Sequence, residues 1–217
     1  MDKPKICAVV INDDTEAARR AEILVDMLEL RMDLVGGGWP EMAKHLHKPW
    51  IATMRDRAHR GKFSGSEQER VDELMRAVKL GAYAIDIELD CPALGDLVKG
   101  IKNRARCLVS YHNWDSTPSL EQLSGTVHLQ LAAGADICKV VTMANSVYDN
   151  LEVLKLPGLF PWVDIISFAM GPVGALSRVL SPLAGGYLTY ASMDESGGSA
   201  PGQMSIEALH KIYRMIS

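Results

Sequence analysis

Eight short apolar runs alternate with helical patterns along the chain of 217 residues, and this alternation constrains the fold most. The runs are rich in β-branched residues, as buried strands are. Strict alternation of strands with helices predicts parallel strands joined by right-handed crossovers. Eight such units most naturally close into a (β/α)8 TIM barrel. The predicted strands cover residues 6–11, 28–34, 50–55, 83–89, 107–114, 137–144, 163–170 and 187–192.

Helical patterns fill the segments between these runs. In residues 66–80, Ser66 is followed three residues later by Glu69, which indicates a capping box, and Gly81 then ends the helix. No linker or shift in composition divides the chain, so we expect one domain over residues 1–217. Further helices are predicted over residues 15–27, 119–133 and 205–216.

A doubly wound open sheet is the competing fold. Its first turn usually carries a glycine-rich phosphate site, but the turn after the first run reads INDDTEAA and has no glycine. The Gly36–Gly38 run follows the second strand, lacks the required spacing and is interpreted as a flexible loop. A barrel typically has roughly 250 residues, so this chain would be a compact one with short loops and a small substrate.

Composition excludes several classes of protein. Hydrophobic residues make up 47% and charged residues 23%, which is typical of a folded globular protein. A net charge of −4 gives no reason to expect a nucleic-acid partner. The longest uncharged stretches, between Asp164 and Asp194, are broken by Arg178, prolines and glycines, so no membrane span is expected. The apolar run at the start is too short for a signal peptide.

Cysteines and histidines show no metal-binding pattern. The four cysteines lack CxxC spacing and mostly lie in apolar runs, so we expect them to be buried and reduced in a cytoplasmic protein. His45 and His47 come nearest to a metal site but lack partners. We therefore expect neither a metal nor another cofactor.

Charged residues interrupt the predicted strands, mostly toward the C-terminal ends, where barrel active sites lie. Each has an ordinary structural explanation as well, such as a buried ion pair or a lysine that reaches the rim. The stretch RDRAHRGK is best explained as a solvated loop at Arg57, Arg60 and Lys62. The combination nevertheless indicates a site, formed by Glu29, Arg31 and Asp33, by Arg55, by Asp86 and Glu88, by His112, and by Lys139.

Lys139 suggests the chemistry of this site. It lies within an apolar segment, where a charged side chain is costly, and burial would favour the neutral amine. A neutral amine can condense with a ketone to form a Schiff base, which acidifies the adjacent carbon. His112 on the neighbouring strand is a suitable proton-transfer group, and arginines would recognise a carboxylate.

At these residues the sequence resembles type I 3-dehydroquinate dehydratase, the Schiff-base enzyme of the shikimate pathway. The resemblance runs from ELRMDL at residues 29–34 to the last predicted helix. Each motif alone is weak, but their common order makes the resemblance specific. The motifs are TMR (53–55), DIEL (86–89), SYHNW (110–114), GADICKV (134–140), LSR (176–178), LAGG (183–186) and SAPGQ (199–203).

The resemblance implies a role for each matching residue. Lys139 would form the Schiff base with the ring ketone of 3-dehydroquinate. His112 would remove a proton from the adjacent carbon and then help hydroxide to leave as water, giving 3-dehydroshikimate. The implied substrate-binding residues are Glu29 and Arg31 for hydroxyls, Arg55, Arg178 as the carboxylate clamp, and Ser199 and Gln203 on a lid at residues 193–203.

One position departs from the family pattern. The family usually has a glutamate four residues after Arg55, beside a glycine pair, and it orients the histidine. Here that residue is His59. Either His59 substitutes for it, or another carboxylate does so, with Glu88 the candidate on the neighbouring strand.

Two alternative functions would use the same pocket. A class I Schiff-base aldolase would use Lys139 but would need a phosphate site near the last strands. A pseudoenzyme would bind the ligand without turnover. The resemblance also implies a homodimer, without an interface that can be located from the sequence.

Overall fold

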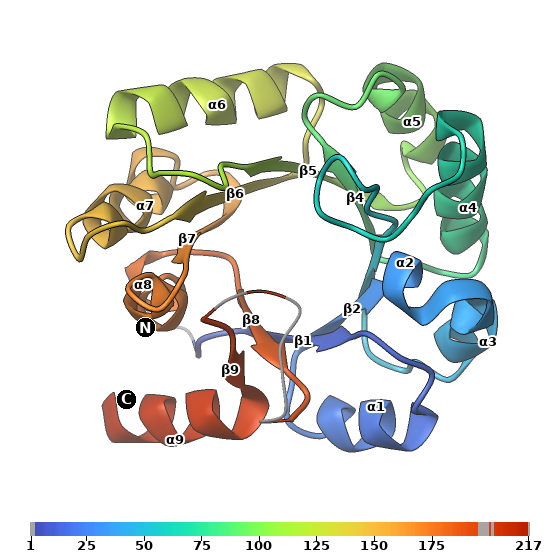
Figure 1. The fold of residues 1–217 in the computed structure, drawn as a ribbon, viewed down its shortest axis with the longest axis horizontal. Coiled ribbons are helices and arrows are strands. Elements are labelled where there is room, and N and C mark those ends of the chain that lie inside the picture. The colour runs from blue at the N-terminus through green and yellow to red at the C-terminus, as the bar shows by residue number, and fades with distance from the viewer. Residues whose placement is uncertain (1–2, 195–199, 201, 217) are drawn as a thin grey trace.

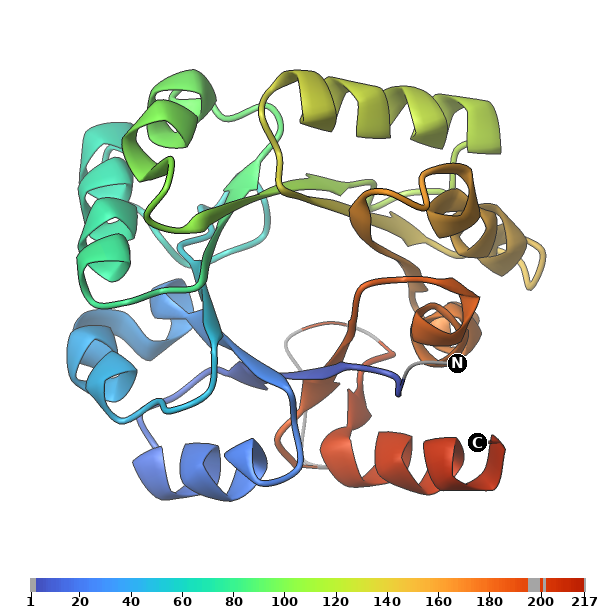
Figure 2. The same ribbon diagram turned by 180° about the vertical axis from the view of Figure 1, so that it is seen from behind.

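The structure is a computed structural model that describes residues 3–194, 200 and 202–216. Parallel strands curl around a central axis and helices surround them (Figure 1), an arrangement seen again from behind in Figure 2. The predicted TIM barrel is therefore confirmed. The strands are β1 (Ile6–Val10), β2 (Met27–Arg31), β3 (Trp50–Thr53), β4 (Ala84–Glu88), β5 (Arg106–His112), β6 (Ile137–Met143), β7 (Asp164–Met170), β8 (Thr189–Ser192) and β9 (Met204–Ser205).

The strands form one parallel sheet in the order β7-β6-β5-β4-β3-β2-β1-β8-β9. At the seam between β7 and β8, the backbone N–H of Tyr187 donates to the carbonyl of Ile165 at 2.7 Å. The short strand β9 pairs with β8 and was not predicted. It brings the segment after residue 202 back to the end of the barrel where β8 finishes.

Helices follow the strands as predicted. Ser66 and Glu69 form the predicted capping box, and Gly81 ends that helix region with a φ of 92°. The helices are α1 (Thr15–Glu22), α2 (Met32–Val35), α3 (Trp39–Lys44), α4 (Glu67–Lys79), α5 (Leu94–Ile101), α6 (Leu120–Ala132), α7 (Asp149–Leu159), α8 (Ala175–Leu180) and α9 (Ile206–Ile216).

The second strand and the helices that follow it, β2 to α3, differ from the prediction. Strand β2 ends at Arg31 and α2 begins at once, so Asp33 lies on a helix and not on the strand. The Gly36–Gly38 run is a 3-10 turn that leads into α3, not a flexible loop. The periodicity of short apolar runs cannot separate a strand end from the first turn of a helix.

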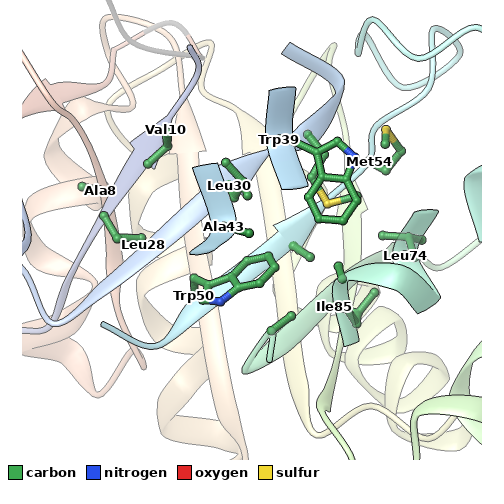
Figure 3. Close-up of a cluster of buried hydrophobic side chains, with 14 of the residues drawn as sticks. Ala8, Val10, Leu28, Leu30, Trp39, Ala43, Trp50, Met54, Leu74 and Ile85 are labelled. Atoms are coloured by element: carbon green, nitrogen blue, oxygen red, sulfur yellow. The ribbon is translucent and has the colours of Figure 1, made fainter. Parts of the chain in front are cut away.

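The core has an inner and an outer layer. Alternate side chains of the strands fill the barrel, among them Cys7, Met27, Ile51 and Ile137. The remaining side chains pack outward against the helices. Figure 3 shows the part of this outer layer where Leu28, Leu30, Trp39, Ala43, Trp50, Leu74 and Ile85 meet.

All four cysteines are buried and have free thiols, as predicted. No helix in the described part of the chain is long and apolar enough to cross a membrane.

Candidate active site

Side chains from neighbouring strands meet near the C-terminal end of the barrel. The ladder places Thr53 beside Arg31 and Asp86. It also places Ser110 beside Glu88 and Lys139. Because all strands run in parallel, their C-terminal ends open onto one pocket.

Lys139 reaches this pocket from β6 and is buried. Its Nζ lies 2.8 Å from Asp86 Oδ2 and 3.3 Å from Glu29 Oε1, and it lies 4.4 Å from the centre of the Tyr190 ring. The expectation of apolar surroundings for the amine is therefore wrong. Its sequence neighbours Cys138 and Val140 face the outer layer instead, because successive side chains alternate across a strand.

Arg55, just beyond β3, connects the acidic side chains to the histidine. Its Nε donates to Glu88 at 3.1 Å, and its terminal nitrogens donate to Asp86 at 3.0 Å and to His112 Nε2 at 2.8 Å. Burial disfavours the charged carboxylate of Asp86, but Lys139 and Arg55 outweigh that cost and hold its pKa below the usual range.

His112 ends β5 and lines the pocket. Because a guanidinium can only donate, the contact with Arg55 makes Nε2 the acceptor of a neutral ring. The ring stacks on Trp114 with centroids 5.3 Å apart and an angle of 11° between the planes. Burial and the charges of Arg55 and Lys139 lower the pKa of His112 well below its ordinary value, so the neutral ring is favoured.

Glu29 and Arg31 extend from β2 into the same pocket. Glu29 Oε1 accepts a hydrogen bond from Thr53 at 3.0 Å in addition to its contact with Lys139. Arg31 is held by two hydrogen bonds to Asp33, at 2.9 and 2.8 Å. Both predicted binding residues therefore face the ligand space in fixed orientations.

Arg178 lies on α8, on the side of the pocket formed by β7 and β8. Its guanidinium is 4.4 Å from the centre of the Phe168 ring. Burial lowers the pKa of Arg178 to about 10, which still leaves the group charged at neutral pH. It therefore supplies a buried cation to the pocket on the side where α8 follows β7.

The pocket brings together most of the predicted site. Glu29, Arg31, Arg55, His112, Lys139, Arg178 and Gln203 all line it. Ser199 lies outside the described residues, and Ala200 beside it is a further lining residue. No group of three or more acidic, histidine or cysteine side chains suited to a metal ion occurs in the described ranges.

Comparison with known proteins decides the family. The model of a family described as type I 3-dehydroquinase matches residues 6–217. The chain belongs to the type I 3-dehydroquinase family.

Relatives and solved structures named 3-dehydroquinate dehydratase match nearly the whole chain. A 3-dehydroquinate dehydratase of Dehalococcoides mccartyi is 43% identical, over 100% of this chain and 98% of its own length. One from Methanosarcina mazei is 34% identical, over 99% and 95%. The crystal structure of 3-dehydroquinate dehydratase from Geobacillus kaustophilus matches with a TM-score of 0.86 at 26% identity and covers 98% of this chain and 91% of its own. This family is one of hydro-lyases.

His59 stands where the resemblance implies a glutamate. Its Nδ1 lies 2.9 Å from Asp56 and its Nε2 lies 3.0 Å from Asp90. Burial opposes its charge, but Asp56, Glu88 and Asp90 outweigh that effect and raise the pKa of His59. The ring is thus held by carboxylates, and it is Arg55 that contacts His112.

Glu88 was the other candidate for the carboxylate that orients His112. It reaches His112 only through Arg55. One oxygen of Glu88 binds Arg55, and the other lies 2.6 Å from Arg70 on α4. The sequence placed Asp86 in the site without naming its partners, and it did not predict Arg70, because neither pairing is local in the chain. A charged residue in an apolar strand was the sequence signal for Asp86.

The stretch RDRAHRGK, interpreted as a solvated loop at Arg57, Arg60 and Lys62, also contributes a residue to the pocket. Arg60 is exposed, as a solvated residue would be, yet it lines the pocket beside His59. Its guanidinium lies 4.6 Å from the centre of the Trp114 ring. Arg57 is also exposed and is not a lining residue.

Proposed function

We propose that this type I 3-dehydroquinase dehydrates 3-dehydroquinate through an imine on Lys139, with His112 as the proton-transfer group. The observation that carries the proposal is the placement of a buried amine and a neutral histidine on adjacent strands of one pocket. A hydro-lyase that works through an imine requires both groups.

The surroundings of Lys139 suit formation of a cation. The amine attacks the ring ketone, and loss of water gives a protonated imine whose positive charge lies where the ammonium had been. Asp86 and Glu29, which pair with that ammonium at 2.8 and 3.3 Å, would then stabilise the iminium. The iminium withdraws electrons and acidifies the adjacent carbon.

His112 completes the elimination. Its low pKa keeps the ring neutral, so it can take the proton from the adjacent carbon. The electron pair forms an enamine, which collapses to expel hydroxide, and the imidazolium returns its proton so that water leaves. Hydrolysis of the imine releases 3-dehydroshikimate and restores the lysine.

The remaining lining residues would hold the substrate. Arg178 is the proposed carboxylate clamp, because it is a buried cation that lines the pocket from α8, after β7. Glu29, Arg31 and Arg55 would contact polar ring groups, and Ser199 and Gln203 would cover the ligand from the segment at residues 193–203.

Turnover measurements test these roles. Formation of the conjugated enone from 3-dehydroquinate is followed by absorbance for the wild type, Lys139→Ala and His112→Ala. We expect both variants to lose at least about 10²-fold in kcat, the lower range for a general base. Cleavage of a carbon–carbon bond would instead indicate an aldolase, and binding without turnover by the wild type would indicate a pseudoenzyme.

We further propose that the protein acts as a homodimer, as the resemblance implies, and that it works in the cytoplasm, as its unpaired cysteines indicate. Light scattering would then give twice the 23.8 kDa chain mass. A mass of one chain at micromolar concentration would contradict the dimer.

A further inference from the structure

The loop after β3 holds Arg60 in an unusual backbone conformation. The φ of Arg60 is 61°, in the region that side chains with a Cβ adopt rarely. The neighbouring loop residues fix it there. Gly61 N–H donates to the carbonyl of Asp56 at 2.6 Å, and a Cβ at Gly61 would lie 2.0 Å from the carbonyl oxygen of Arg55.

The same loop is tied to α2 on its other side. The N–H of Lys62 donates to Asp33 Oδ2 at 3.0 Å, and Asp33 also holds Arg31. A conformation that glycine would adopt without strain is therefore imposed on an arginine at the pocket. Strain retained in this way tends to occur at functional sites.

The side chain of Arg60 is placed by an aromatic ring. It lies over Trp114, which stacks on His112. A ring face orients a guanidinium without neutralising its charge. Arg60 is thus an exposed cation with a defined position at the edge of the pocket.

The other basic side chains on this wall contact carboxylates. Arg31 pairs with Asp33, Arg55 with Asp86 and Glu88, and His59 with Asp56 and Asp90. In the described part of the chain, no such ion pair is found for Arg60. Its charge is therefore directed to solvent and to whatever anion enters the pocket.

We propose that Arg60 is a substrate-binding residue that attracts the carboxylate of the substrate to the pocket mouth and stabilises the bound anion electrostatically. This rests on the proposed function for the identity of the substrate. Arg178, on α8, would hold the carboxylate once bound, while Arg60 acts over a longer range. The proposal gives the strained residue a role that glycine could not perform.

A pair of matched variants tests this role. Arg60→Gln and Arg57→Gln each remove one exposed positive charge from the same loop, but only Arg60 lines the pocket. We expect Arg60→Gln to raise KM on the order of tenfold at low salt, with kcat unchanged. The difference from wild type should shrink as NaCl is added, because salt screens exposed charges. Arg57→Gln should remain close to wild type.

Arg60→Gly separates function from folding. Glycine adopts a φ of 61° without strain, so this variant should be at least as stable as wild type in thermal unfolding while showing the same increase in KM. The proposal is overturned if Arg60→Gln and Arg57→Gln have the same KM. It is also overturned if Arg60→Gln lowers kcat at unchanged KM, since Arg60 would then only position His112 through Trp114.

Direct binding keeps this test separate from the proposed function. Titration calorimetry of 3-dehydroquinate with His112→Ala, alone and combined with Arg60→Gln or Arg57→Gln, measures affinity without elimination. We expect about tenfold weaker binding only with Arg60→Gln. If the wild type fails to turn over, the proposed function fails, and the same calorimetric comparison still accepts or rejects the role of Arg60.

Discussion

At the scale of the residue, Arg55 determines how the pocket is organised. It binds Asp86 and Glu88 and donates to His112, while Arg70 takes the second oxygen of Glu88. Arg55, Arg70, Asp86 and Glu88 are buried and each has a partner of opposite sign, which offsets the cost of burial. His112, the histidine proposed as the base, is thereby oriented by a cation, and its neutral form is favoured.

This arrangement predicts the pH dependence of the reaction. A base is lost as the pH falls through its pKa, and burial, Arg55 and Lys139 place the pKa of His112 below its ordinary value of 6.5. We therefore expect kcat/KM to stay level down to pH 6.5 and to fall only at lower pH. Steady-state rates from pH 4.5 to 8 measure this, and a midpoint of the acid limb at or above 6.5 would contradict it.

The sequence identifies which residues form the site better than it identifies which of them are in contact. Lys139 and His112 stand out because a charged or titratable residue in an apolar strand is unusual. The ion pairs of Lys139 with Asp86 and Glu29 join residues far apart in the chain, so no local pattern reveals them. The contact of Arg60 with Trp114 is hidden for the same reason.

At the scale of the element, local capping defines where helices begin. Helix α6 opens with a capping box in which Ser119 Oγ accepts from Gln122 N–H and Gln122 Oε1 accepts from Ser119 N–H. Such boundaries could be predicted because all the atoms involved lie within four residues. The end of β2 could not, since Arg31 and the first turn of α2 continue one apolar pattern.

The cap of α6 gives a stability prediction with an internal control. Ser119→Ala removes the side-chain acceptor and should cost about 1 kcal/mol of unfolding free energy in urea titrations. Ser124→Ala, inside the same helix, should be neutral or slightly stabilising, because alanine is the better helix former. Equal effects of the two substitutions would show that the cap does not stabilise the fold.

At the scale of the whole molecule, the barrel brings the strand ends together. The alternation of strands and helices extends along the whole chain, which is why the architecture could be predicted from sequence. The addition of β9 beside β8 could not, because two residues carry no periodic signal. The pairing of β9 with β8 places Gln203, just before β9, at the pocket that Lys139 lines from β6.

The central claim is that Lys139 forms an imine with the substrate, and borohydride trapping tests it most directly. The protein is incubated with 3-dehydroquinate and borohydride, digested, and mapped by mass spectrometry. We expect a covalent mass increment on the peptide that holds Lys139, retained in His112→Ala and absent from Lys139→Ala. A folded wild-type protein that binds 3-dehydroquinate yet carries no increment on Lys139 would contradict the account.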